Sequence, residues 1–98
     1  MKKPFKIDLG SYGRDGEWVE VLDPRWLTPR ETKEINASGD GEKILRAIAV
    51  AWHLKDESGA ELVDPANDSY EDIPNGLFAV IVDEFRQLSG SPLPKAGG

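Results

Sequence analysis

The stretch EKILRAIAVAWHL, residues Glu42–Leu54, decides which fold this chain of 98 residues adopts. Its apolar side chains include Ile44, Ile48 and Trp52, whose spacing of four places them along one side of a helix. The only polar residues of the stretch are Glu42, Lys43, Arg46 and His53, so a helix here is apolar around most of its circumference. We therefore predict one helix over residues 42–54 that is covered on more than one side, in part by a bound partner.

The segment KDESG, residues Lys55–Gly59, follows at once and is mostly polar. Its carboxylates suggest a loop for Ca²⁺ or Mg²⁺, but the ligand spacing of an EF-hand is absent. Aspartate, serine and glycine are also the residues that form tight turns by bonding to nearby backbone. We predict a turn, with a small hairpin whose tip is Ser58 and Gly59, and no metal site.

Upstream, two short segments have the alternation of half-buried strands. In PFKIDL (Pro4–Leu9) every second residue is a large apolar one, and EWVEVL (Glu17–Leu22) places Val19 and Val21 on one face with Trp18 on the other. The glycine-rich segment GSYGRDG joins the two and contains the residues of a turn. This pattern predicts a β-hairpin.

Two further helices are predicted from their start signals. Thr28 and Glu31 have the spacing of a capping box, and a proline at the first helical position favours a helix over Pro29–Ala37. A second apolar stripe predicts a helix over Pro74–Leu88, with Asp72 as its N-cap.

The expected fold is α+β: an N-terminal β-hairpin followed by three helices, in a small, mostly helical single domain. The length of the chain fits one domain, which we expect to span residues 1–88. Residues 89–98, SGSPLPKAGG, hold three glycines and two prolines, and we expect them to form a flexible C-terminal tail.

Composition argues against several classes of protein. The net charge is −6 and the basic residues are scattered, which argues against nucleic-acid binding. Cysteine is absent, so disulfides, thiol chemistry and cysteine-ligated zinc are excluded. The longest apolar run, AIAVAW, is far too short to span a membrane, and no signal-peptide pattern follows the N-terminal lysines.

The sequence assembles no catalytic or cofactor site. His53 is the only histidine, and no nucleophile motif accompanies it, so we expect no catalytic residues and no enzyme. We expect His53 to lie at the end of the long helix and to bond its last carbonyls. The glycines of SGDG precede a helix, but Asp40 and Glu42 already occupy its positive end, so we expect no phosphate or cofactor there.

The aromatic residues are the remaining candidates for a function. Trp26 follows DPR in a loop, and the sequence leaves open whether it packs under the hairpin or anchors a partner. We expect partner contacts from this tryptophan and from large apolar side chains of the predicted helices. These candidate partner-binding residues are Trp26, Ile48, Trp52, Phe78 and Phe85.

Four segments follow one another in a suggestive order. A hairpin of the type FKIDLG…GEWVEVLDPRWLTPRE comes first, then an apolar segment ending in AVAWHL. Next comes KDESGAELVDP, which completes the pattern W-x-L-x-D-x-x-G-x-x-L-x-x-P, and last a helix that opens with IPNGLFAVIVDEF. Over residues 4–88 this order and length resemble the small tail assembly chaperones of long-tailed bacteriophages. The motifs are loose, and it is their order that carries the resemblance.

The resemblance implies a chaperone that binds the tape measure protein, a long and partly apolar helical chain. It would keep that chain soluble in the host bacterial cytoplasm while tail tube subunits assemble around it. Further partners implied are the tail tube protein and a longer, frameshifted form of the chain itself, and the oligomeric state stays open. The alternative is a structural virion subunit, a tail or head–tail connector protein that forms rings.

Overall fold

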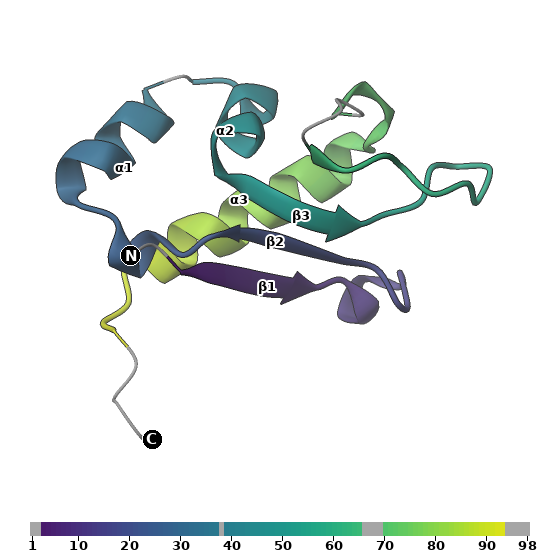
Figure 1. The fold of residues 1–98 in the computed structure, drawn as a ribbon, viewed down its shortest axis with the longest axis horizontal. Helices are drawn as coiled ribbons and strands as arrows, with labels where there is room; N and C mark the ends of the chain where they lie inside the picture. Colours follow the sequence, from purple (N-terminus) through teal and green to yellow (C-terminus); the bar gives the residue numbers. More distant parts are fainter. Residues whose placement is uncertain (1–2, 38, 66–69, 94–98) are drawn as a thin grey trace.

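The computed structural model describes residues 3–37, 39–65 and 70–93 of the chain. Within them, three strands form one antiparallel sheet in the order β1-β2-β3, and three α-helices accompany it (Figure 1). The strands are β1 (Pro4–Asp8), β2 (Trp18–Leu22) and β3 (Ala49–His53). The helices are α1 (Pro29–Asn36), α2 (Gly41–Ile48) and α3 (Asn75–Ser89), with short 3-10 turns η1 (Gly10–Tyr12), η2 (Pro24–Trp26) and η4 (Tyr70–Asp72).

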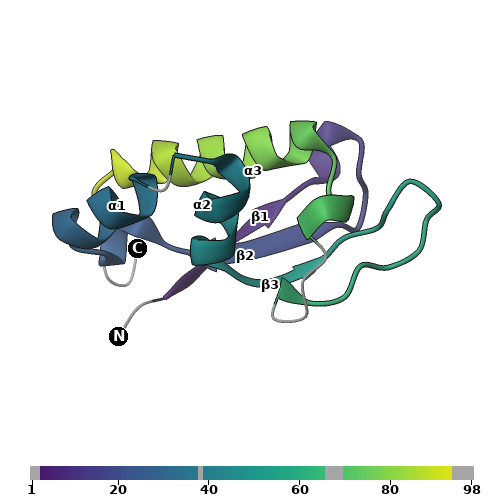
Figure 2. The same cartoon turned by 90° about the horizontal axis from the view of Figure 1, so that it is seen from above.

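The predicted N-terminal hairpin is confirmed. β1 and β2 pair antiparallel, and Ile7 lies opposite Val19, which in turn lies opposite Trp52 of β3. These three side chains are buried, because they share the sheet face that α2 and α3 cover (Figure 2). The alternation of apolar residues therefore identified the inward faces of both hairpin strands correctly.

The predicted helix over 42–54 is wrong in its second half. α2 ends at Ile48, and β3 begins at the next residue, Ala49, with no loop between them. A short, continuously apolar run fits a buried helix and a buried strand equally well, and periodicity alone cannot separate them. β2 decides the outcome, because it offers an edge to which residues 49–53 can pair.

The junction carries a second irregularity. The register between β2 and β3 shifts at Glu20 and Val21, which lie opposite Ala51 and Ala49, so Val50 is an extra residue in the strand. This is the geometry of a β-bulge, and it leaves Val50 49% exposed. The domain is α+β as expected, but it contains more sheet than the predicted mostly helical fold.

The helix start signals gave mixed results. Thr28 and Glu31 form the predicted capping box, with the Glu31 N–H donating to Thr28 Oγ1 at 3.2 Å. Asp40 caps α2 by accepting the Glu42 N–H at 2.9 Å, as expected from the acidic residues there. The prediction for Asp72 is wrong: it lies in η4, and Pro74 precedes α3 without a side-chain cap.

One apolar core joins the sheet to the helices. Its buried members are Ile7, Leu9, Val19, Val21, Ile44, Leu45, Ile48, Trp52, Leu54, Tyr70, Ile73, Leu77, Ile81, Val82 and Phe85. α3 contributes the longest stripe, with Leu77, Ile81 and Phe85 spaced by four residues. α3 continues through Ser89, one residue into the predicted tail, and residues 94–98 of that tail lie outside the described part of the chain.

Candidate protein-binding site

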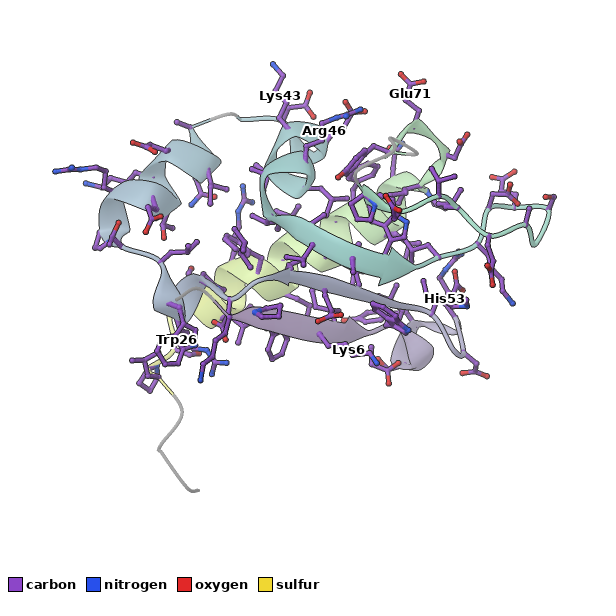
Figure 3. All side chains as sticks on the ribbon, in the orientation of Figure 1. Lys6, Trp26, Lys43, Arg46, His53 and Glu71 are labelled. Carbon is purple, nitrogen blue, oxygen red and sulfur yellow. The ribbon has the colours of Figure 1, made fainter. Side chains whose placement is uncertain are left out.

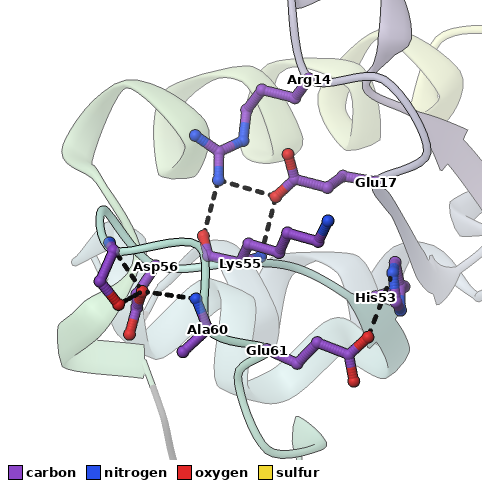
Figure 4. Close-up of polar contacts among 8 residues, drawn as sticks. Arg14, Glu17, His53, Lys55, Asp56, Ala60 and Glu61 are labelled. Atoms are coloured by element: carbon purple, nitrogen blue, oxygen red, sulfur yellow. Dashed lines mark hydrogen bonds and ion pairs between the residues drawn. The ribbon is translucent and has the colours of Figure 1, made fainter.

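The KDESG segment is a turn, as predicted. The Asp56 Oδ1 atom accepts the Ser58 N–H at 2.9 Å, the Ser58 hydroxyl at 2.6 Å and the Ala60 N–H at 3.0 Å (Figure 4). These bonds, the Ser58 hydroxyl first, lower the pKa of the Asp56 carboxyl. Gly59 has φ +89°, a conformation that suits glycine. A bridge between Lys55 and Glu61 completes the small hairpin.

Next to this turn lies a buried polar network that the sequence analysis missed. The Glu17 carboxylate is buried and accepts the Lys55 N–H at 2.8 Å and the Arg14 guanidinium at 2.7 Å (Figure 4). Arg14 also donates to the Lys55 carbonyl at 2.7 Å. The network ties the loop before β2 to the chain that leaves β3. Arg14 and Glu17 are 41 and 38 positions from Lys55 in the sequence, so no local pattern indicates that they meet it.

His53 does not lie at a helix end, and that prediction is wrong. It is the last residue of β3, where its ring stacks on Trp18 at 6.5 Å, and Nε2 lies 3.7 Å from a Glu61 carboxylate oxygen. On the same face, the Lys6 ammonium lies 4.7 Å from the Trp18 ring. Among the described residues, no three histidine, aspartate or glutamate side chains gather closely enough to hold a metal ion.

Three of the five candidate partner-binding residues lie in the core. Ile48 and Phe85 are fully buried and Trp52 is 7% exposed. Trp52 donates its indole N–H to the Val63 carbonyl at 2.6 Å and meets Tyr70 edge-on at 5.0 Å. These side chains hold the domain together, so their surface is not available to a partner in this state.

The other two candidates keep accessible surface. Trp26, at the end of η2, is 37% exposed, and the Lys3 ammonium lies 4.9 Å from its ring (Figure 3). Phe78 is half-buried on α3, where it lines a hollow of about 430 Å³ together with Ile44 and Val82. The two residues lie on different parts of the surface, so the structure does not bring the five candidates together.

A better candidate is an apolar groove between α1 and α2. Its floor and walls are lined by Leu22, Leu27, Glu31, Glu34, Ile35, Lys43 and Ala47, around a volume of about 360 Å³. Binding pockets commonly have volumes of roughly 300 to 1,000 Å³. α1 buries no residue fully, and Ile35 and Leu27 are only half-buried, so apolar surface between the two helices stays accessible.

The groove has a sequence signal that went unused. Glu31 and Ile35 are four residues apart on α1, and Lys43 and Ala47 are four apart on α2. Each pair therefore lies along one face of its helix. The sequence did not indicate where α2 ends. Without that boundary, the faces of α1 and α2 that point toward each other cannot be identified.

A larger hollow has a different chemistry. It has a volume of about 650 Å³ and lies between the 56–58 turn and the start of α3. Carboxylates dominate its lining, which includes Asp56, Glu57, Glu71 and Asp72. Ile73 and Pro74 are the apolar residues in its lining, so this hollow offers little apolar surface to anchor a partner.

Comparison with known protein families, curated proteins and solved structures finds no match to this chain. The resemblance to tail assembly chaperones is thus still a prediction. Within residues 3–37, 39–65 and 70–93, no helix combines the length and apolar character needed to cross a membrane.

Proposed function

We propose that this chain is a protein-binding module whose groove between α1 and α2 takes the apolar face of a partner helix. The accessible aliphatic lining of that groove, from Leu27, Ile35 and Ala47, is the observation that carries the proposal. Helix-in-groove binding uses apolar side chains at spacings of three and four, which fill a hollow between two helices. We assign the module no catalytic residue and no cofactor.

Its biological role, in this proposal, is that of a phage tail assembly chaperone in the host bacterial cytoplasm. The tape measure protein is the partner, and the chaperone keeps it soluble while the tail tube forms. The order of segments over residues 4–88 supports this role, as does the net charge of −6, which favours solubility of a complex with an apolar chain. The tail tube protein and a longer, frameshifted form of the chain are further partners within the same proposal.

The groove suits temporary binding. Its lining mixes aliphatic side chains with the charged Glu34 and Lys43, which are exposed. A partner helix would bury only one stripe of its surface there, which favours modest affinity and tolerance of different sequences. A chaperone that must release its partner during assembly needs both properties.

Co-expression tests this function. The tagged chain is produced with the longest helical protein encoded near its gene, purified by the tag and sized by light scattering. A soluble, stoichiometric complex is expected, with the long protein insoluble on its own. If the long protein stays insoluble while this chain forms a large ring alone, the structural virion subunit replaces the chaperone.

Two matched variants locate the site within that experiment. Ala47→Glu places a charge in the groove on α2, and Ala79→Glu places the same charge on an exposed position of α3 outside it. We expect Ala47→Glu to abolish the complex and Ala79→Glu to leave it intact. The reverse result would move the site to the hollow beside Phe78.

A further inference from the structure

The two walls of the α1/α2 groove carry opposite charges. α1 presents Glu31 and Glu34, which are three residues apart and both line the groove. α2 presents Lys43. The other charged residues of α2, Glu42 and Arg46, form an ion pair at 3.3 Å and do not line the groove. The groove is therefore acidic along one wall and basic along the other.

One residue of the acidic wall, Glu31, is held in position. Glu31 accepts the Thr28 N–H at 3.0 Å in the capping box, which holds its carboxylate at the start of α1. Glu34 and Lys43 are exposed at the surface (Lys43 is labelled in Figure 3). Charges at the rim of an interface contribute more to the choice and orientation of a partner than to raw affinity.

We propose that the groove binds an amphipathic helix with basic residues on the flank that meets α1 and acidic residues on the flank that meets α2, and thereby selects the direction of that helix. This inference rests on the proposed function. A helix turned end for end in the groove keeps its apolar face inward but exchanges its two flanks. A given partner sequence therefore matches the walls in only one of its two directions.

Synthetic peptides provide the probe. Two peptides of about 18 residues, five helical turns, share the same leucine stripe and the same composition. Viewed down the helix axis from the N-terminus, the first carries lysines on the flank clockwise of the leucine stripe and glutamates on the opposite flank. The second has the two flanks exchanged. A third peptide carries glutamates on both flanks. We expect the first two to bind equally well. We expect the third to bind about tenfold more weakly, because it has no basic flank to pair with Glu31 and Glu34.

Direction is measured by fluorescence quenching. The chain has no cysteine, so Asn36→Cys at the end of α1 provides one labelling site. A quencher at the peptide N-terminus is expected to approach that label with one of the two mixed peptides and not with the other. In the triple variant Glu31→Gln, Glu34→Lys, Lys43→Glu, we expect the other mixed peptide to be the one whose quencher approaches the label. Glutamine at position 31 preserves the capping box, because its side chain also reaches the N-cap backbone.

A distant charge exchange serves as the control. Lys55→Glu with Glu57→Lys alters the turn after β3 and leaves the groove unchanged, so the peptide direction is expected to stay as in the native chain. Mixed peptides that bind in both directions equally would overturn the charge inference and leave the groove in place. If no peptide binds, or if Ala47→Glu binds them as well as the native chain does, the groove itself is rejected and the proposed function fails with it.

Discussion

Glu17 accepts the backbone N–H of Lys55 at 2.8 Å, across a sequence separation of 38 residues. The contact joins the end of the β1–β2 loop to the first residues after β3. Because Glu17 also holds Arg14, which in turn donates to the Lys55 carbonyl, both backbone polar groups of Lys55 are satisfied by these two side chains. The outgoing end of β3 is thus fixed by a charge that is almost fully buried.

Removing that carboxylate is expected to be costly. Glu17→Ala leaves the Lys55 N–H and the Arg14 guanidinium without their acceptor, and we expect the free energy of unfolding to fall by about 2–4 kcal/mol. Glu61→Ala is the surface control: Glu61 is exposed, and its contact with His53 spans 3.7 Å, so we expect a change below about 0.5 kcal/mol. Urea unfolding measures both. Equal effects for the two variants would show that the Glu17 network is not a structural tie.

The switch from α2 to β3 within one apolar run is testable with two alanines. Ala47 lies in the helix and Ala51 in the strand, four residues apart. Ala47→Val is expected to cost about 0.5 kcal/mol, because a β-branched side chain is restricted in a helix. Ala51→Val is expected to be neutral or stabilising, since valine favours strands. A similar loss for both variants in thermal unfolding would indicate that the helix continues through residue 51.

Acid should weaken the domain through Asp23. This buried carboxylate binds the Arg25 side chain at 2.7 Å and its N–H at 3.0 Å, and the side-chain bond lowers the pKa of Asp23 below its ordinary value of 3.8. As the pH falls, the unfolded chain binds a proton at this position before the folded chain does. The stabilisation is therefore complete above pH 3.8 and is lost as the pH falls through the lower pKa of the folded state.

The variant Asp23→Asn isolates this contribution. We expect it to be less stable than the native chain at neutral pH, by about 1–3 kcal/mol, and to show a shallower loss of stability in acid. Urea titrations between neutral pH and the acid range measure both quantities. Parallel pH profiles for the variant and the native chain would rule out the Asp23–Arg25 pair as a source of acid sensitivity.

The candidate anchor Trp26 can be tested directly, although it does not itself line the groove. It is partly exposed and directly precedes Leu27, which lines the groove. We expect Trp26→Ala to leave the domain folded and to weaken binding of the partner by more than about 1 kcal/mol, the usual effect of removing an aromatic anchor. Circular dichroism checks the fold, and co-purification checks binding. A variant that folds and binds as the native chain does would show that Trp26 is not an anchor.

Local signals in the sequence determined much of this fold. The capping box of Thr28 and the turn at Asp56 depend on interactions among residues only a few positions apart. The alternation around Ile7 and Val19 is likewise visible within a few residues of each strand, although the contacts that bury these side chains are not local. Such local patterns can be recognised in the sequence without knowing which distant segments the chain packs against. They gave the hairpin, α1 and the turn after β3.

The tertiary structure alone decided the rest. Whether residues 49–53 form helix or strand depends on the free edge of β2, and whether Glu17 can be buried depends on Lys55 arriving beside it. The groove between α1 and α2 depends in turn on where α2 stops. Each of these outcomes requires two segments that are far apart in the chain to meet, and their pairing energy appears only once they do.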